Sequence, residues 1–183
     1  KDQTFKNQLG DREIWSCASS WRPHKRLVDN VRYFLKKAPE SSIFVVAGSG
    51  YTEEEKVKIQ QLASEEHVKN KQIIMVGNID YHTLRQLYDA SSTFVHLAYL
   101  DHCPNVVVDA YAHGCQIVCS NSGGTSEIGA GFKVVFEKGD APWDFSPIEL
   151  YNPPELSFNR ETTFVGENDA IESSEKCLNS YEK

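Results

Sequence analysis

Short apolar runs alternate with amphipathic stretches from about residue 14 to residue 136. The apolar runs are typical of buried strands and comprise Ile14–Ala18, Ile43–Ala47, Ile73–Val76, Phe94–Ala98, Ile117–Cys119 and Val134–Phe136. The amphipathic stretches predict helices at Leu27–Leu35, Val57–Val68, Leu84–Ala90 and Val106–Ala112. Strands that are apolar at every position belong to parallel sheets covered on both faces. The pattern therefore predicts a doubly wound α/β fold, with a parallel sheet of about six strands and helices on both faces.

The pattern changes after about Gly139, where prolines are frequent and no clear strand or helix is predicted among them. We expect residues 139–183 to form a proline-rich wrapping segment that ends in a helix at Glu167–Lys183. A chain of 183 residues suits one domain of ordinary size. Residues 1–138 are therefore expected to form the body of this domain, with residues 139–183 as part of it.

Glycines and charged side chains follow five of the predicted strands. In a doubly wound sheet, ligands bind beyond the carboxyl ends of the strands, where the strand order reverses. The segments at that edge are Ser19–Lys25, Gly48–Gly50, Gly77–Ile79, Tyr99–Asn105 and Asn121–Gly124. We expect the binding site to lie among these loops.

Two glycine-rich turns, Gly48–Gly50 and Gly123–Gly124, suit phosphate binding. A residue without Cβ lets backbone N–H groups approach an anion, and the next helix offers its positive end. The alternative for each is a tight strand-to-helix turn with no ligand. A GxGxxG sequence is absent after the first strand, which argues against a nicotinamide or flavin enzyme. No GxSxG nucleophile elbow occurs either, which argues against a hydrolase.

A basic cluster of Arg22, His24, Lys25 and Arg26 follows the first strand. Lysine supplies a point charge and arginine a bidentate fork, so this turn could neutralise a diphosphate. The alternative is a solvated basic turn. The formal net charge of -7 argues against nucleic acid as a partner. A phosphate site in this chain must therefore be local.

Two aspartates stand eight positions apart, Asp101 on a loop and Asp109 on the helix that Pro104 opens. Asp109 could accept two ribose hydroxyls, or it could simply favour the helix N-terminus. Asp101 could accept hydroxyls of a sugar, or it could cap the loop. Two histidines have plain structural explanations: His96 as a satisfied histidine of the core or pocket wall, and His113 as a helix C-terminal cation.

The five cysteines are odd in number and lack zinc-ligand spacing. We expect free thiols in a reducing compartment and no metal site. No export signal is visible, and the chain begins as though cut from a longer protein. These features predict a cytoplasmic protein, either free or at the cytoplasmic face of a membrane.

The segment from Asp101 to Glu127, DHCPNVVVDAYAHGCQIVCSNSGGTSE, resembles the donor-site signature of retaining glycosyltransferases with the GT-B fold, in the family 4 or glycogen-synthase-like group. The match extends over about Ile14–Gly131. The resemblance implies the C-terminal, donor-binding half of a GT-B fold, which is Rossmann-like. It implies transfer of a sugar from a UDP- or GDP-type nucleotide sugar to a hydroxyl of a glycan, lipid or protein, without metal or cofactor. The N-terminal acceptor domain is absent, so this chain alone is expected to be inactive.

The resemblance also implies roles for particular residues. Lys25, with Arg22 near the place of the family arginine at Ser20, would bind the diphosphate, and Asp101 would contact the transferred sugar. Asp109 would hold the ribose; both aspartates are one methylene shorter than the usual glutamates. The remaining donor-binding positions are Gly48, Gly50, Gly77, Asn78, Ile79, Cys103, Pro104, Asn105, Val106, Gly123 and Gly124, with Glu127 completing the pattern.

Two alternatives stay open. Ser20 in place of an arginine and the proline-rich tail suit a non-catalytic nucleotide-sugar sensor or interaction domain. A sugar-nucleotide epimerase on the same fold is the other alternative. An epimerase would turn over the nucleotide sugar without an acceptor, whereas a sensor would only bind it.

Overall fold

A computed structural model describes residues 7, 9–65, 68, 70–139 and 146–164. In chain order the elements are β1 (Ile14–Ala18), η1 (Pro23–Lys25), α2 (Leu27–Lys37), β2 (Ile43–Ala47), α3 (Glu53–Ala63), β3 (Gln72–Gly77), α4 (Tyr81–Ala90), β4 (Thr93–His96), α5 (Asn105–Ala112), β5 (Gln116–Ser120), η3 (Thr125–Glu127), β6 (Lys133–Glu137), α6 (Pro147–Leu150) and β7 (Leu156–Thr163).

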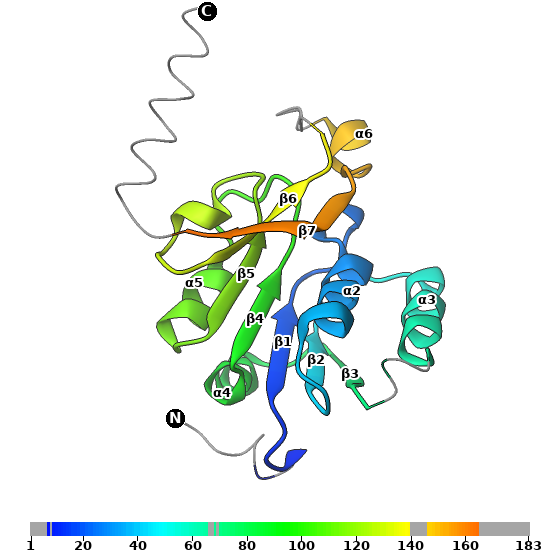
Figure 1. Ribbon diagram of the computed structural model, residues 1–183, viewed down its shortest axis with the longest axis vertical. Helices are drawn as coiled ribbons and strands as arrows, with labels where there is room; N and C mark the ends of the chain where they lie inside the picture. Colours follow the sequence, from blue (N-terminus) through cyan, green and yellow to red (C-terminus); the bar gives the residue numbers. More distant parts are fainter. Residues whose placement is uncertain (1–6, 8, 66–67, 69, 140–145, 165–183) are drawn as a thin grey trace, which may run out of the picture.

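The strands form one seven-stranded sheet in the order β3-β2-β1-β4-β5-β6-β7 (Figure 1). Neighbouring strands from β3 to β6 pair in parallel, and β7 pairs antiparallel with β6. The strand order reverses between β1 and β4: β2 and β3 follow on one side of β1, whereas β4, β5 and β6 follow on the other. The predicted α/β fold is therefore confirmed, with the reversal point at the centre of the sheet.

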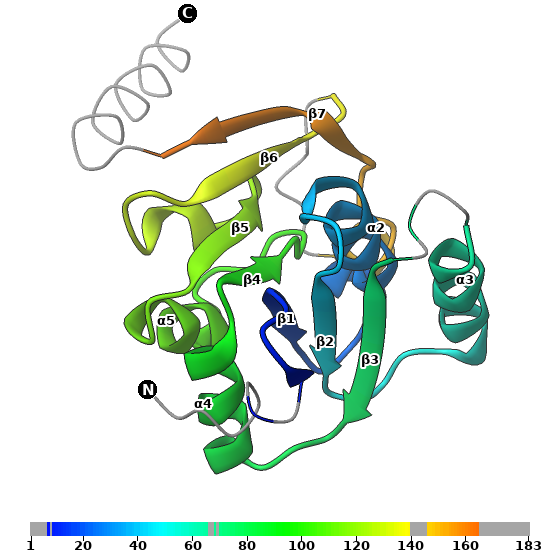
Figure 2. The same ribbon diagram turned by 60° about the horizontal axis from the view of Figure 1, so that its bottom comes forward.

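Helices cover both faces of the sheet, with α2 and α3 on one side and α4 and α5 on the other (Figure 2). On the α2 side, the rings of Phe34 and Phe44 stack with their centroids 4.8 Å apart. On the other side, Tyr88 packs edge-on against Phe94 at 5.5 Å. Strand β2 is buried at all five positions because both helix layers cover it. Within the described part of the chain, no helix is long and apolar enough to cross a membrane.

Several elements differ from the sequence prediction, and three of the differences are informative. Helix α3 begins at Glu53, ahead of the predicted Val57, because Thr52 and Glu55 form a capping box. Strand β4 ends at His96, so the last two residues predicted for it belong to the following loop. The short helix α6 lies within the segment where no clear helix was predicted.

Strand β7 is a second element that the sequence analysis missed. It is an edge strand, and only its first residue, Leu156, is fully buried. Charged and polar side chains follow from Asn159 onward, so the period-2 apolar pattern of a half-buried strand is lost. The predicted helix at residues 167–183 lies outside the described residues, as does the beginning of the proline-rich segment.

Candidate functional site

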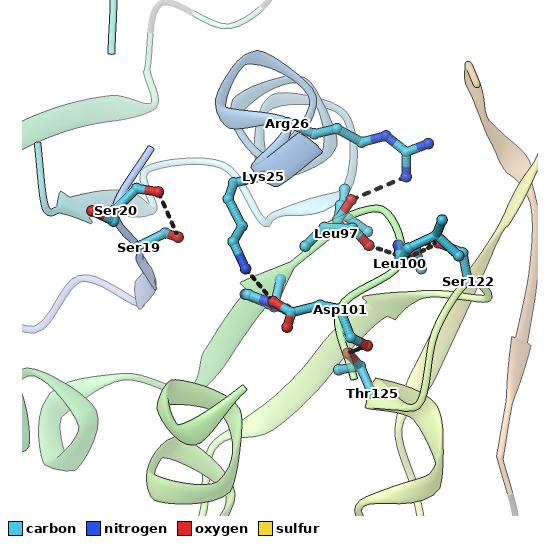
Figure 3. Close-up of polar contacts among 12 residues, drawn as sticks. Ser19, Ser20, Lys25, Arg26, Leu97, Leu100, Asp101, Ser122 and Thr125 are labelled. Carbon is cyan, nitrogen blue, oxygen red and sulfur yellow. Dashed lines mark hydrogen bonds and ion pairs between the residues drawn. The ribbon is translucent and has the colours of Figure 1, made fainter. Parts of the chain in front are cut away.

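Lys25 and Asp101 meet at the carboxyl edge of the sheet, where the loops after β1 and β4 come together (Figure 3). Lys25 is the last residue of η1, and Asp101 lies between β4 and α5. The Lys25 ammonium forms an ion pair with Asp101 Oδ2. Both side chains are largely buried, with 20% and 16% of their surface exposed. Two residues that sequence analysis placed in one site are therefore in direct contact.

The Asp101 carboxylate is held by a second donor, His96. The His96 Nε2 atom lies 2.9 Å from the same oxygen, Oδ2. Burial by itself would raise the pKa of Asp101, but the hydrogen bonds from His96 and Lys25 outweigh it and bring the pKa well below its usual range. Burial also lowers the pKa of His96. Asp101 is thus a carboxylate and His96 a neutral imidazole at neutral pH.

The loop that carries Lys25 is fixed by Asn30, a residue that the sequence analysis did not single out. The Asn30 side-chain amide donates to the backbone oxygens of Lys25 and Arg26 at 3.0 and 2.8 Å. Its carbonyl oxygen accepts the Leu97 backbone N–H at 3.1 Å. Asn30 is 1% exposed, so it links η1 to the loop after β4 from inside the protein. A buried asparagine on an otherwise apolar helix face was the available sequence signal.

Arg26 does not take part in the basic surface that the sequence suggested. Its backbone adopts a left-handed conformation with φ of 51°, and Figure 3 shows its side chain leading away from Asp101. The guanidinium forms a buried ion pair with Glu137, both side chains being 1% exposed. It also donates to the backbone oxygens of Leu97 and Pro154. Arg26 is therefore a structural cation that ties the β1 turn to β6 and to the segment before β7.

His24 and Arg22 differ in their surroundings. The His24 ring stacks on Tyr151 with centroids 5.5 Å apart. Burial, together with the charge of Lys25, lowers the pKa of His24 to about 4, so His24 is neutral at pH 7. Arg22 is exposed at the start of η1. The positive charges that can face a ligand here are therefore those of Lys25 and Arg22.

The glycines of two turns allow the loops to pack backbone against backbone. A Cβ on Gly48 would lie 1.8 Å from the Ser19 carbonyl oxygen, and one on Gly123 would lie 2.2 Å from that of Asp101. Gly50 meets Trp21 and Gly124 meets His102 in the same way. The glycines thus have a packing reason of their own, and they set the loop positions from which backbone amides would meet a ligand.

The remaining predicted donor-binding residues lie on the loop after β3 and around the start of α5. Gly77 has φ of 67° and accepts the Gly48 N–H at 2.7 Å, so the loops after β2 and β3 are joined, with Asn78 exposed and Ile79 half-buried. Pro104 is the N-cap of α5 and supplies no side-chain hydrogen bond to that helix. Cys103 and Asn105 are exposed and Val106 half-buried beside it.

Asp109 is half-buried in the middle of α5. Among the described residues, no hydrogen bond or ion pair joins it to Lys25 or Asp101. Thr125 was not predicted, yet its hydroxyl donates to the Asp101 backbone oxygen at 3.2 Å and supports the loop from η3. Glu127 is exposed at the end of η3.

The two histidines that the sequence analysis treated as structural have the expected kind of surroundings. His96 is buried and satisfied by Asp101. His113 is the C-cap of α5 and pairs through Nδ1 with Asp89 at 2.9 Å.

Four cysteines fall within the described residues, and all four are free thiols. Burial raises the pKa of Cys17 and raises that of Cys119 to about 12, so neither is a thiolate at neutral pH. The fifth, Cys177, lies outside the described residues. Among the described side chains, no group of three or more His, Cys, Asp or Glu is placed to hold a metal ion.

A cleft of about 550 Å³ lies at the opposite edge of the sheet, between the segment before β1 and the ends of α4 and α5. Its lining includes Arg12, Glu13 and Asp89, and none of the predicted site residues. Arg12 is already bonded to the backbone oxygens of Ser41 and Ser42. Since ligands of doubly wound sheets bind at the carboxyl edge, this cleft is not the candidate site.

Three solved structures illustrate the same fold. HepE from Anabaena in complex with UDP-glucose has a TM-score of 0.59 and 16% identity, over 68% of this chain and 35% of that one. WaaG, a glycosyltransferase involved in lipopolysaccharide biosynthesis, has a TM-score of 0.53 and 16% identity, over 81% and 38%. The α,α-trehalose-phosphate synthase (UDP-forming) from Burkholderia xenovorans has a TM-score of 0.52 and 14% identity, over 68% and 32%.

The chain thus spans about a third of the length of these proteins. At these identities the likeness concerns the fold. No curated protein matches the sequence. Residues 5–142 match the family described as Glycosyl transferases group 1. Because this match includes the whole parallel sheet and every residue of the candidate site, the chain belongs to the glycosyl transferases group 1 family.

Proposed function

We propose that this chain is the C-terminal, nucleotide-sugar-binding domain of a retaining glycosyltransferase of the family 4 or glycogen-synthase-like group. The donor is a UDP- or GDP-type nucleotide sugar, and the acceptor is a hydroxyl of a glycan, lipid or protein. The acceptor domain is a second half outside this chain, in keeping with the chain's share of its structural neighbours. Those neighbours include a protein solved with UDP and UDP-glucose.

The observation that carries the proposal is the contact between Lys25 and Asp101, beside the point where the strand order reverses. A cation and a carboxylate in one place suit a ligand that carries both a diphosphate and a sugar. The ammonium has three N–H donors, and Asp101 uses one of them. Lys25 can therefore keep Asp101 and still donate to phosphate oxygens.

Each side chain has a role in this proposal. Lys25 and Arg22 bind the diphosphate, together with backbone amides near Gly123, Gly124 and the start of α5. Asp101 accepts sugar hydroxyls, and Asp109 accepts the ribose hydroxyls. The loop of Gly77, Asn78 and Ile79 contacts the base.

In the reaction, the bond between the sugar's anomeric carbon and the diphosphate oxygen breaks, and a bond to the acceptor oxygen forms. The acceptor hydroxyl loses its proton, which the departing diphosphate takes up. Negative charge builds up on the departing diphosphate. Fixed positive charges and backbone amides in a water-poor site stabilise such charge strongly. Lys25 and Arg22 supply that stabilisation here, in a site that needs no divalent metal.

Calorimetric titration of this chain with UDP, GDP and ADP tests the proposal. One nucleotide should bind saturably, and Lys25→Ala should weaken binding about 10- to 100-fold, as expected for the loss of a charge-assisted hydrogen bond. Asp109→Ala should weaken binding to a similar extent, because the ribose loses its acceptor.

Lys56→Ala is the matched control, because Lys56 lies on α3 in an exposed ion pair with Glu53. It should leave the affinity unchanged. Absence of binding by all three nucleotides, in a chain that melts cooperatively, would contradict the donor-site assignment.

A second candidate function rests on Ser20, which is exposed and stands where the resemblance places an arginine. A domain without that charge could bind nucleotide sugars without supporting transfer. Under this alternative, Ser20→Arg should raise nucleotide affinity, whereas no gain is expected if Arg22 already supplies the second charge.

A further inference from the structure

Both donors to the Asp101 carboxylate use the same oxygen atom. Lys25 Nζ and His96 Nε2 each contact Oδ2. Among the described residues, no further hydrogen bond or ion pair to this carboxylate is present, so Oδ1 can accept a hydrogen bond from a ligand.

His96 is fixed by the sheet. It is the last residue of β4, is 5% exposed, and stands beside Cys119 of β5 in the parallel register. Lys25, in contrast, is the last residue of the one-turn helix η1, and its ammonium group is carried on a flexible side chain of four carbons. The two donors to Asp101 therefore differ in kind, one being rigid and neutral and the other flexible and charged.

From this geometry we infer that His96 is a positioning residue for the donor sugar: it holds Asp101 by Oδ2 so that Oδ1 accepts a sugar hydroxyl. The inference rests on the proposed function. When a diphosphate draws Lys25 toward its oxygens, the bond from His96 keeps the carboxylate in place.

The direction of the hydrogen bond follows from the charges. Asp101 is an ionised carboxylate and can only accept, so His96 must carry a proton on Nε2. Lys25 and His24 also face this cluster, and the positive charge of Lys25 disfavours a second cation at His96. A neutral Nε2–H imidazole satisfies both conditions.

The test compares UDP with UDP-glucose, and GDP with GDP-mannose, on the wild type, His96→Leu and His96→Gln. For the pair that binds, the ratio of nucleotide Kd to nucleotide-sugar Kd should fall about 10-fold in His96→Leu, as one hydrogen bond to a charged group is lost. Affinity for the nucleotide alone should stay within about 2-fold. His96→Gln, which keeps a side-chain N–H, should restore most of the ratio.

His113→Leu is the matched control, since His113 also pairs with an aspartate at 2.9 Å but lies at the C-terminal end of α5. It should leave the ratio unchanged. An unchanged ratio in His96→Leu overturns the inference alone, and so does an equal loss of affinity for nucleotide and nucleotide sugar. A wild type that binds no nucleotide removes the proposed function and the inference together.

A ligand-free measurement separates the geometry from the binding. In ¹⁵N-histidine NMR spectra at pH 7, His96 should be the neutral Nε2–H tautomer, and Asp101→Asn should shift its Nε2 resonance. A neutral Nδ1–H tautomer would overturn the inference, because such a ring cannot donate to Oδ2.

Discussion

Lys25 and Arg26 are adjacent in sequence, yet they serve opposite sides of the same loop. Arg26 adopts φ of 51°, which turns its side chain toward Glu137 while Lys25 reaches Asp101. A left-handed conformation costs an ordinary residue about 1–2 kcal/mol, so the surrounding contacts must hold it. The type of residue at each position was visible in the sequence, but the backbone conformation that separates the two cations was not. Sequence analysis could therefore place Lys25 and Asp101 in one site, while it grouped Arg26 with them wrongly.

His24 provides a prediction about pH at the residue scale. Its pKa is about 4 in the folded protein, against an ordinary value of 6.5, chiefly because burial disfavours the charged ring. The unfolded chain therefore binds the additional proton first, and folding stability should fall as the pH drops from about 6.5 toward 4. His24→Phe keeps the stacking on Tyr151 and removes the titration. Urea unfolding at pH 7 and pH 4.5 should show a smaller loss of stability in His24→Phe than in the wild type.

The same acidic side chains are present in both proteins, so the difference between the two pH dependences reports on His24 and on its charge interaction with Asp101. His96 acts in the same direction, because burial lowers its pKa too, and it leaves a residual pH dependence in the variant. Parallel pH dependence of the wild type and His24→Phe would contradict the prediction.

At the scale of elements, the loops after β1 and β4 are each locked to a neighbouring loop through glycine. Gly48→Ala should destabilise the protein strongly, because the new Cβ would lie 1.8 Å from the Ser19 carbonyl oxygen. Gly131→Ala is the matched control: Gly131 has φ of 81°, and no atom lies within 4 Å of its added Cβ. The control should cost about 1–2 kcal/mol for its backbone conformation. Gly48→Ala should cost about 1–3 kcal/mol more for the overlap.

Urea unfolding of the two variants measures this difference in the free energy of unfolding. If both variants lost the same free energy of unfolding, the backbone conformation alone, and not loop packing, would explain why residue 48 is a glycine.

The parallel strands and their helices could be predicted because each carries its own apolar pattern. Strand β7 could not be predicted in this way. Among the described residues, it is an edge strand that pairs only with β6, and Leu156 and Phe158 are the apolar side chains that it packs on the core. Likewise, the hydrogen bonds of Asn30 connect segments far apart in sequence, and no local pattern encodes such a contact. The candidate site was therefore predictable in its charged residues, but not in the side chains that support them.

At the scale of the whole molecule, one buried polar network connects the first strand's loop to the last strands. Arg26 and Glu137 are its centre, and Leu97, Ser122 and Pro154 bond to them. Glu137→Leu should cost about 3–5 kcal/mol, since it leaves an arginine buried without its partner. Arg26→Met combined with Glu137→Leu should recover much of this loss.

Chemical denaturation measures all three variants. Lys138→Ala is the control, because Lys138 forms an exposed ion pair with Glu155 and should change stability by less than about 1 kcal/mol. A loss in Glu137→Leu no larger than that of the control would show that the network does not hold the molecule together.

The ion pair between Lys25 and Asp101 has a consequence for selectivity. The Asp101 carboxylate lies against the Lys25 ammonium, so an anion that approaches this cation also meets a negative charge. A small anion such as inorganic phosphate is repelled by this carboxylate and brings no sugar hydroxyl to it. A nucleotide sugar offers anionic oxygens to Lys25 and hydroxyl donors to Asp101 at the same time. The ion pair should therefore favour ligands that carry both a diphosphate and a sugar.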